Sequence, residues 1–245
     1  QCTLVVRNTS FSGTYFRSID SYVLFNGMTM ANSPGDCLML FHDAQPVWLD
    51  NLSITGAAGA GLALSGDNRG NNYLIGPNTV LQNNLYPVSV GNAGLLPGSV
   101  IPATGNVHNY IPWTAGAQVD SRGPVIWAPV AVPYAIESDF PHVVGLMTIL
   151  PGVDVKIGAD VGFVVDAGTL VARGLPGLPI TFERLNPAQP WAFIGIQTFG
   201  DRVEHCLLDG SNYGLSAAGS LLNVESCTFR NNYIASQANG FGALV

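Results

Sequence analysis

Charged side chains are scarce in this chain. Its 245 residues include 9 Lys and Arg and 16 Asp and Glu, so that only 10% of the residues carry charge, whereas soluble domains average about 25%. Lys156 is the sole lysine, and the arginines are scattered along the chain. No basic stripe is therefore available to neutralise phosphates, which excludes nucleic acid as an expected partner.

Long hydrophobic runs are also missing, although 47% of the residues are hydrophobic. The longest run, 125–136, contains Pro129 and Pro133 and is shorter than the about 20 residues that a membrane-spanning helix needs. We therefore expect no membrane span. The 29 glycines and 16 prolines interrupt the apolar stretches, and both residue types penalise helix interiors. The composition predicts an all-β protein.

Motifs for catalysis or metal binding are absent. The chain has no Asp-Asp pair, whereas glycoside hydrolysis needs two carboxylates held a few ångström apart. Its cysteines lack the close spacing of a zinc site, and no nucleophile triad follows from the spacing of its histidines. We expect no catalytic residue, no metal and no cofactor. The cysteines are Cys2, Cys37, Cys206 and Cys227, and the histidines are His42, His108, His142 and His205.

A repeat dominates the sequence. Several segments share one template: an apolar residue, a polar residue, a turn-prone residue, and then an alternating pair. The segments are 6–11, 25–30, 49–54, 203–208 and 224–229, and segment 77–81 matches the later part. The turn-prone position holds types that tolerate the bent backbone of a corner. These predicted corner residues are Asn8, Gly27, Asn51, Asn78, His205 and Ser226.

The spacing of the corners indicates a solenoid. The corners recur at similar but unequal intervals, both in the first half of the chain and near the C-terminus. A second apolar column follows them, consisting of Leu38, Leu62, Val88, Leu215 and Ile234. Each repeat is therefore expected to be one coil, with a loop of adjustable length, of a single β-solenoid domain, residues 1–245. Coils are predicted in 1–94 and 142–245, and the Pro- and Gly-rich segment 95–141 is either a set of elaborated coils or a packed flap.

Several segments resemble the right-handed parallel β-helix repeats of secreted bacterial surface proteins. They are 149–157, 168–174, 179–182, Trp191 and 224–232, joined in the first half by 78–84, 86–90 and 105–111. The resemblance covers most of residues 47–232 and implies a right-handed, single-stranded parallel β-helix. It also suggests an extracellular or cell-surface location, in keeping with a chain that starts at Gln1 like an exported mature fragment. It implies no catalytic residues, because this fold carries enzymes, tailspikes, adhesins and passive surface proteins.

The cysteines form two candidate pairs. Cys206 and Cys227 occupy the same template position in successive repeats, so they should stack either as a disulfide or as two buried thiols. Cys2 and Cys37 could form a second disulfide that ties the first coils together.

The two ends of the sequence both lack the polar or helical cap that usually protects a solenoid. The count from Val224 through the C-terminus to Val6 of a second copy equals the spacing from Asn51 to Asn78. A head-to-tail contact is thus predicted to continue the β-helix, with Phe229 beside Phe11. Such a contact does not close on itself and generates a filament. The predicted interface residues are Leu4, Val6, Asn8, Phe11, Val224, Ser226, Phe229, Ile234, Phe241 and Val245.

The sequence therefore favours a structural subunit of an extracellular filament or surface fibre whose partner is a second copy of itself. The alternative is a carbohydrate-binding or adhesive surface module. In that case Trp113 and Trp127 are the candidates for stacking on surface glycans, since Trp48 and Trp191 lie in apolar strand patterns that suggest the core. A polysaccharide lyase or hydrolase is the least favoured hypothesis.

Overall fold

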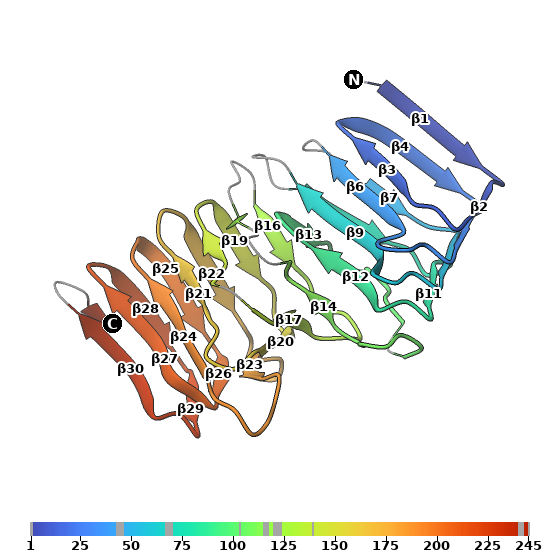
Figure 1. The fold of residues 1–245 in the computed structure, drawn as a ribbon. Helices are drawn as coiled ribbons and strands as arrows, with labels where there is room; N and C mark the ends of the chain where they lie inside the picture. Colours follow the sequence, from blue (N-terminus) through green and yellow to red (C-terminus); the bar gives the residue numbers. More distant parts are fainter. Residues whose placement is uncertain are drawn as a thin grey trace.

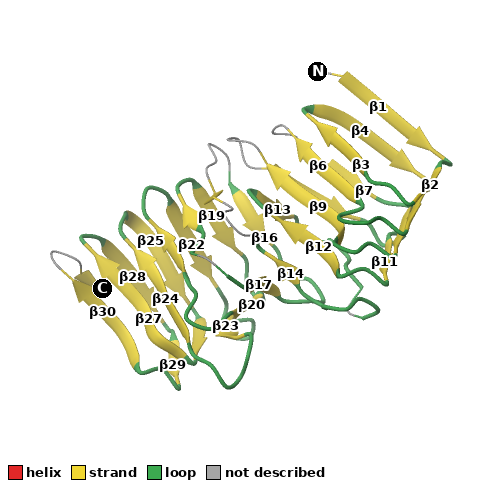
Figure 2. Cartoon of the chain, in the orientation of Figure 1, coloured by secondary structure: helices red, strands yellow, loops and turns green. Residues whose placement is uncertain are grey.

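The protein is an elongated stack of β-strands with its two termini at opposite ends (Figure 1). The computed structural model describes residues 2–42, 47–66, 71–102, 104–114, 118–119, 124–138, 140–239 and 243–244. In these residues 31 strands are joined by loops and turns, without any helix (Figure 2). The described part of the chain accordingly offers no helix with the length and apolarity of a membrane span.

The strands lie on three faces, and every third strand in the chain returns to the same face. All strand pairs are parallel, from β1 with β4 at one end to β28 with β31 at the other. Three strands make one coil, so the 31 described strands form ten coils and the start of an eleventh. The predicted all-β solenoid of the parallel β-helix type is confirmed.

The first face contains β1 (Cys2–Arg7), β4 (Ser21–Asn26), β7 (Val47–Leu49), β10 (Asn71–Ile75), β13 (Ala93–Leu95), β16 (Val125–Trp127), β19 (Leu146–Ile149), β22 (Thr169–Arg173), β25 (Phe199–Glu204), β28 (Leu221–Glu225) and β31 (Ala243–Leu244). The second face contains β2 (Ser10–Ser12), β5 (Met28–Ala31), β8 (Leu52–Thr55), β11 (Val80–Gln82), β14 (Ile111–Pro112), β17 (Tyr134–Ile136), β20 (Asp154–Ile157), β23 (Ile180–Arg184), β26 (Cys206–Asp209) and β29 (Thr228–Arg230). The third face contains β3 (Phe16–Ile19), β6 (Leu38–His42), β9 (Ala60–Gly66), β12 (Tyr86–Val90), β15 (Gln118–Val119), β18 (His142–Val143), β21 (Phe163–Val165), β24 (Trp191–Ile196), β27 (Ser211–Ala218) and β30 (Ile234–Asn239).

The core consists of apolar columns that run along the axis. Phe11 pairs with Met30, Met30 with Ile54, and Ile54 with Leu81, so that equivalent template positions lie directly beside one another in successive coils. Side chains alternate along each strand, and the residues between these inward positions face outward. Each column buries its apolar side chains against the next coil, which is the main source of stability in a repeat fold.

The first corner of a coil lies between the first and second faces, and in the first three coils and the last two full coils it has a left-handed backbone. Five of the six predicted corner residues have positive φ, between 48° and 70°: Asn8, Gly27, Asn51, His205 and Ser226. Asn78 differs, because this coil has one extra residue between β10 and β11. Asn78 instead sits in a turn, where its backbone N–H donates to the Asp50 carboxylate at 2.9 Å.

A second left-handed corner follows five residues after the first, between the second and third faces. It is occupied by Gly13, Asn32, Gly56, Asn83, Gly210 and Asn231, all with positive φ. Backbone hydrogen bonds link it from coil to coil, as from Gly13 N–H to Ala31 C=O at 2.9 Å. Asn and Gly are the residues that adopt this backbone at least cost. Their recurrence five residues after the first corner is therefore a sequence signal for the second corner, which the repeat template did not include.

Inward asparagines brace the second corner. The buried Asn84 side chain accepts from Ala57 N–H at 2.9 Å and donates to Ile54 C=O at 3.3 Å. Asn106 and Asn232 likewise donate to the Leu81 and Leu208 carbonyls of the preceding coils. Each amide satisfies backbone groups that the turn leaves without a strand partner.

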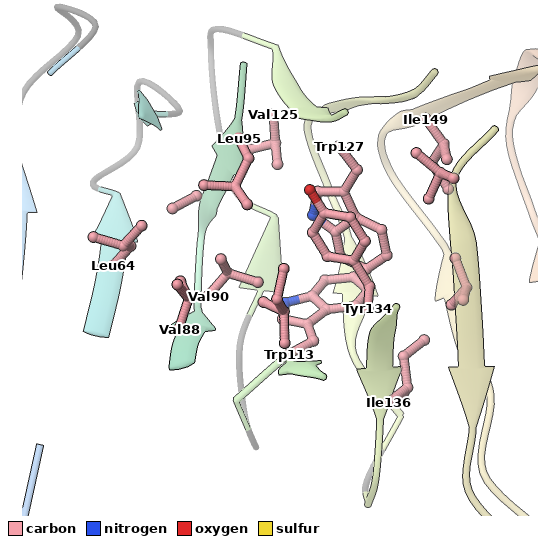
Figure 3. Close-up of a cluster of buried hydrophobic side chains, with 14 of the residues drawn as sticks. Leu64, Val88, Val90, Leu95, Trp113, Val125, Trp127, Tyr134, Ile136 and Ile149 are labelled. Atoms are coloured by element: carbon pink, nitrogen blue, oxygen red, sulfur yellow. The ribbon is translucent and has the colours of Figure 1, made fainter. Parts of the chain in front are cut away.

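Segment 95–141 follows the coil pattern in its described part, because β14, β16 and β17 join the same faces as their neighbours. It also holds a cluster of large buried aromatic side chains (Figure 3). Trp127 stacks on Tyr134 with ring centroids 4.5 Å apart and an interplanar angle of 7°, and meets Trp113 edge-on at 5.2 Å. Of the two alternatives for this segment, elaborated coils describe it better than a flap.

Substitutions of three glycines separate backbone strain from steric clash at the corners. Gly27 has φ +70°, and an added Cβ would lie 2.5 Å from Asn8 Oδ1. Gly13 has φ +67°, but the space around it is open. Gly35 has open space and no left-handed φ. We expect Gly13→Ala to lower the free energy of unfolding by about 1 kcal/mol and Gly27→Ala by about 2 kcal/mol or more. Gly35→Ala is the control. Urea unfolding followed by circular dichroism measures all three, and equal losses would contradict the corner assignment.

Candidate functional site

The end coils present strand edges and apolar side chains. β1, β2 and β3 pair only with β4, β5 and β6 among the described strands, and β29 and β30 only with β26 and β27. The inward residues of the first coil are incompletely covered: Leu4 is 36% exposed, and Phe11 and Phe16 are half-buried. Val224 and Phe229 are half-buried in the last full coil. Within the part of the chain that the structure describes, both ends thus combine free strand edges with apolar side chains, which is a surface suited to adding a strand.

The C-terminal end differs from the predicted junction in one respect. β31 pairs with β28 through Leu221 with Ala243 and Leu222 with Leu244. The sequence predicted that Val6 of a second copy lies beside Val224 and that this strand edge is free. The edge is occupied by β31 along Leu221 and Leu222, so the second part of the prediction is wrong. The chain returns to β28 earlier than the predicted count requires, because loop lengths vary between coils. The remainder of β28, residues 223–225, has no strand on this side among the described residues.

The other predicted interface residues occupy both ends of the solenoid. Asn8 and Ser226 form left-handed corners in the first and last full coils. Ile234 is half-buried and pairs with Tyr213. Phe241 and Val245 lie outside the described residues.

The cysteines are free thiols where the structure describes their side chains. Cys37 is fully buried and is a free thiol, so the predicted disulfide between Cys2 and Cys37 is not formed. The side chain of Cys2 is not among those that the structure describes. Cys206 and Cys227 follow the predicted stacking, because the next residues, Leu207 and Thr228, are register partners. They are nevertheless two thiols without a disulfide.

The stacked thiols differ in acidity. The interaction between the two neighbouring thiols lowers the pKa of Cys227 to about 7 and raises that of the buried Cys206. Burial raises the pKa of Cys37 to about 11. The half-exposed Cys227 is therefore the most reactive of these three, because the thiolate is the nucleophile.

Alkylation of the native protein tests this order. We expect iodoacetamide to modify Cys227 first, with a rate that rises as the pH increases through about 7 and its thiolate forms. Cys37 and Cys206 should react only after unfolding. Peptide mass spectrometry against pH measures each site, and a Cys227 rate that rises only near the usual thiol pKa, or equal modification of Cys206, would contradict the arrangement.

Three of the four tryptophans lie opposite to the prediction. Trp113 and Trp127, the candidates for stacking on glycans, are 2% and 1% exposed. Trp48, which was assigned to the core, is 63% exposed, whereas Trp191 is buried as expected. Trp48 lies between the inward Val47 and Leu49 of β7, so its side chain points outward. The two buried indoles offer no surface for a sugar.

A pocket of about 330 Å³ opens where the second face turns into the third. Its wall includes Tyr86 at the start of β12, Trp113 after β14 and Glu137 after β17. Tyr86 stacks on His108 with centroids 5.2 Å apart, and Tyr110 completes a group of three rings. The Tyr86 and Tyr110 hydroxyls both donate hydrogen bonds to the Glu137 carboxylate. The sequence template gave no signal for this group, because its members come from three coils.

Charged residues elsewhere mostly pair between neighbouring coils. Lys156 contacts Glu183 at 2.9 Å, and Arg173 contacts Glu204 at 2.6 Å across β22 and β25. Glu204 and Glu225 are register partners, as the template suggested. The described residues contain no group of three or more His, Cys, Asp or Glu side chains able to hold a metal ion.

Comparison with known proteins gave no relative: no family model, curated protein or solved structure matches this chain.

Proposed function

We propose that this chain is a structural module of an extracellular filament or surface fibre that extends end to end by continuing the β-helix into a second copy. The observation that carries the proposal is the pair of end coils. Among the described residues, β1, β2 and β3 at one end and β29, β30 and part of β28 at the other have a free strand edge, beside apolar side chains that are incompletely covered. The extracellular location is part of the proposal and rests on the resemblance to secreted β-helix repeats.

The junction requires one rearrangement. β31 contributes two residues beside β28, whereas β1 offers six. In the proposed contact, β1 of the incoming copy replaces β31 on β28, while β2 and β3 add to β29 and β30. The exchange gains hydrogen bonds along β28 and covers apolar residues at both ends, each of which favours association.

The scarcity of lysine supports this association. Edge lysines normally block strand-to-strand contacts, and the chain has a single lysine, Lys156, in β20. No described lysine therefore lies on an end strand.

Sedimentation velocity over a concentration series, together with negative-stain electron microscopy, tests the proposal. We expect filaments with an axial repeat of about 48 Å, because each copy adds ten coils at about 4.8 Å per coil. A variant lacking residues 240–245 should assemble at lower concentration, since β31 no longer competes. A monomer at high concentration, with and without the deletion, would contradict the proposal.

A further inference from the structure

Cys206 and Cys227 form a pair of thiols near the C-terminal end of the solenoid. Cys206 begins β26, and Cys227 directly precedes β29, which lies beside β26 (Figure 1). Because the following residues, Leu207 and Thr228, are register partners, the two cysteines are neighbours across one coil step of about 4.8 Å. This separation falls within the Cα–Cα range of about 4.4–6.8 Å that a disulfide spans.

The two side chains have equivalent surroundings. Cys206 Sγ lies 3.6 Å from the Ala172 carbonyl oxygen, and Cys227 Sγ lies 3.2 Å from the Val203 carbonyl oxygen. Ala172 and Val203 are register partners in successive coils. Each sulfur also lies 3.3 Å from the carbonyl oxygen two residues before it. The thiols are thus directed the same way and do not point apart, which is the second geometric requirement for a disulfide.

The two thiols differ in accessibility. Cys227 is half-exposed, whereas Cys206 is 2% exposed. The neighbouring thiol lowers the pKa of Cys227 to about 7 and, together with burial, raises the pKa of Cys206. A groove of about 350 Å³ opens beside the pair, and its lining includes Ser226 and Thr228 on either side of Cys227. A small reagent therefore meets Cys227 first, with Cys206 behind it as the second thiol.

We propose that Cys206 and Cys227 are a reversible redox pair, which closes to a disulfide by exchange with a small-molecule disulfide and staples the last full coil to the coil before it. The Cys227 thiolate attacks one sulfur of the reagent and displaces one small thiol, which leaves a mixed disulfide. Cys206 then loses its proton, attacks Cys227 Sγ and displaces the second small thiol. The two protein thiols are oxidised by two electrons, and the reagent is reduced to two thiols.

The staple acts on the coil that is held least. Among the described residues, β29 and β30 pair with strands on one side only, so this coil opens more readily than the inner coils. A bond from Cys227 to Cys206 links the corner of this coil to the corner beneath it. Both cysteines belong to one chain, and the proposal is therefore independent of end-to-end assembly.

Exchange with bis(2-hydroxyethyl) disulfide tests the pair in dilute native protein. We expect peptide mass spectrometry to find the Cys206–Cys227 bond in the monomer, formed at a rate that increases as the pH rises through about 7. Dithiothreitol should restore both thiols. In Cys206→Ala the mixed disulfide should accumulate at Cys227, because no second thiol displaces it. Cys37→Ala, which removes a buried thiol next to β6, should leave the bond unchanged.

Amide hydrogen exchange measures the staple itself. The β29 and β30 amides should exchange about tenfold more slowly after oxidation, because the last full coil no longer opens away from β26. Amides of β5 and β6, in the second coil, should exchange at the same rate before and after oxidation.

Three outcomes would overturn the proposal. A mixed disulfide that persists at Cys227 in the unchanged chain would show that the two sulfurs do not meet, and dimers joined through Cys227 would show the same. A Cys206–Cys227 bond without slower exchange in β29 and β30 would remove the staple. Unchanged circular dichroism of Cys206→Ala and Cys37→Ala excludes misfolding as the cause of any difference.

Discussion

Trp127→Ala is expected to lower the free energy of unfolding by about 3–5 kcal/mol, the range for truncating a buried aromatic side chain. Trp127 is 1% exposed, pairs in register with Leu95 and Ile149, and stacks on Tyr134. Its removal opens a cavity between three successive coils. The shift of the urea unfolding midpoint, followed by circular dichroism, measures the loss.

Trp48→Ala is the matched control for this prediction. The Trp48 side chain is 63% exposed on the outer side of β7, so its truncation should change stability by only about 0.5 kcal/mol. A larger loss for Trp48 than for Trp127 would mean that the strands of the first face have the opposite orientation.

Leu4→Lys is expected to weaken end-to-end association by about 100-fold or more. Leu4 faces inward in β1, beside the buried Val23 of β4, and is 36% exposed only because its coil is the first. In the proposed junction this position becomes buried, and burial of an unpaired ammonium costs about 3 kcal/mol or more. The monomer itself tolerates the charge, because the side chain can reach water at the open end. Sedimentation measures the change in association.

Val5→Lys is the matched control, because Val5 points outward in the same strand and is 44% exposed. It should weaken association much less than Leu4→Lys does, because its ammonium group stays in water and adds only a charge at the strand edge. A second pair tests the other end: Phe229→Lys, at an inward position of β29, should block association, and the exposed neighbour Thr228→Lys should not. If Leu4→Lys and Val5→Lys assembled equally well, β1 would not be part of the junction.

The solenoid could be predicted from sequence because its corners impose a local rule. A left-handed residue recurs at the corners of the first and last coils, and few residue types adopt that backbone without strain. Asn8, Gly27 and Asn51 therefore mark successive coils. The same rule would have located the second corner, since Gly13, Asn32 and Gly56 follow five residues behind.

Features that depend on which face a side chain occupies were harder to predict. Strands of three residues, such as β7 and β16, are too short for apolar composition to separate inward from outward positions. Trp48 was assigned to the core for this reason, although its place beside the inward Leu49 of the template indicates the outer face. The Tyr86 pocket joins residues from coils far apart in sequence, which no local pattern encodes.

The register of the end-to-end contact could not be predicted from the sequence either, because the number of residues per coil varies. The offset between register partners is short where Leu4 of β1 pairs with Val23 of β4, and much longer where Leu95 of β13 pairs with Trp127 of β16. The number of residues from Val224 to Val6 of a second copy equals the length of one coil of this chain. This equality is therefore compatible with a β-helix that continues into the second copy, but it does not specify the register of that contact.

Cross-linking between copies tests end-to-end assembly most directly. In a background with Cys2 and Cys227 replaced by serine, one chain carries Ser10→Cys in β2 and the other Thr228→Cys in β29, both at exposed positions. If β2 of one copy lies beside β29 of the next, these residues are adjacent at about 4.8 Å, within the span of a disulfide. Mild oxidation of the mixture should give the mixed dimer and neither chain's own dimer. No cross-link, or equal amounts of all three dimers, would contradict head-to-tail assembly.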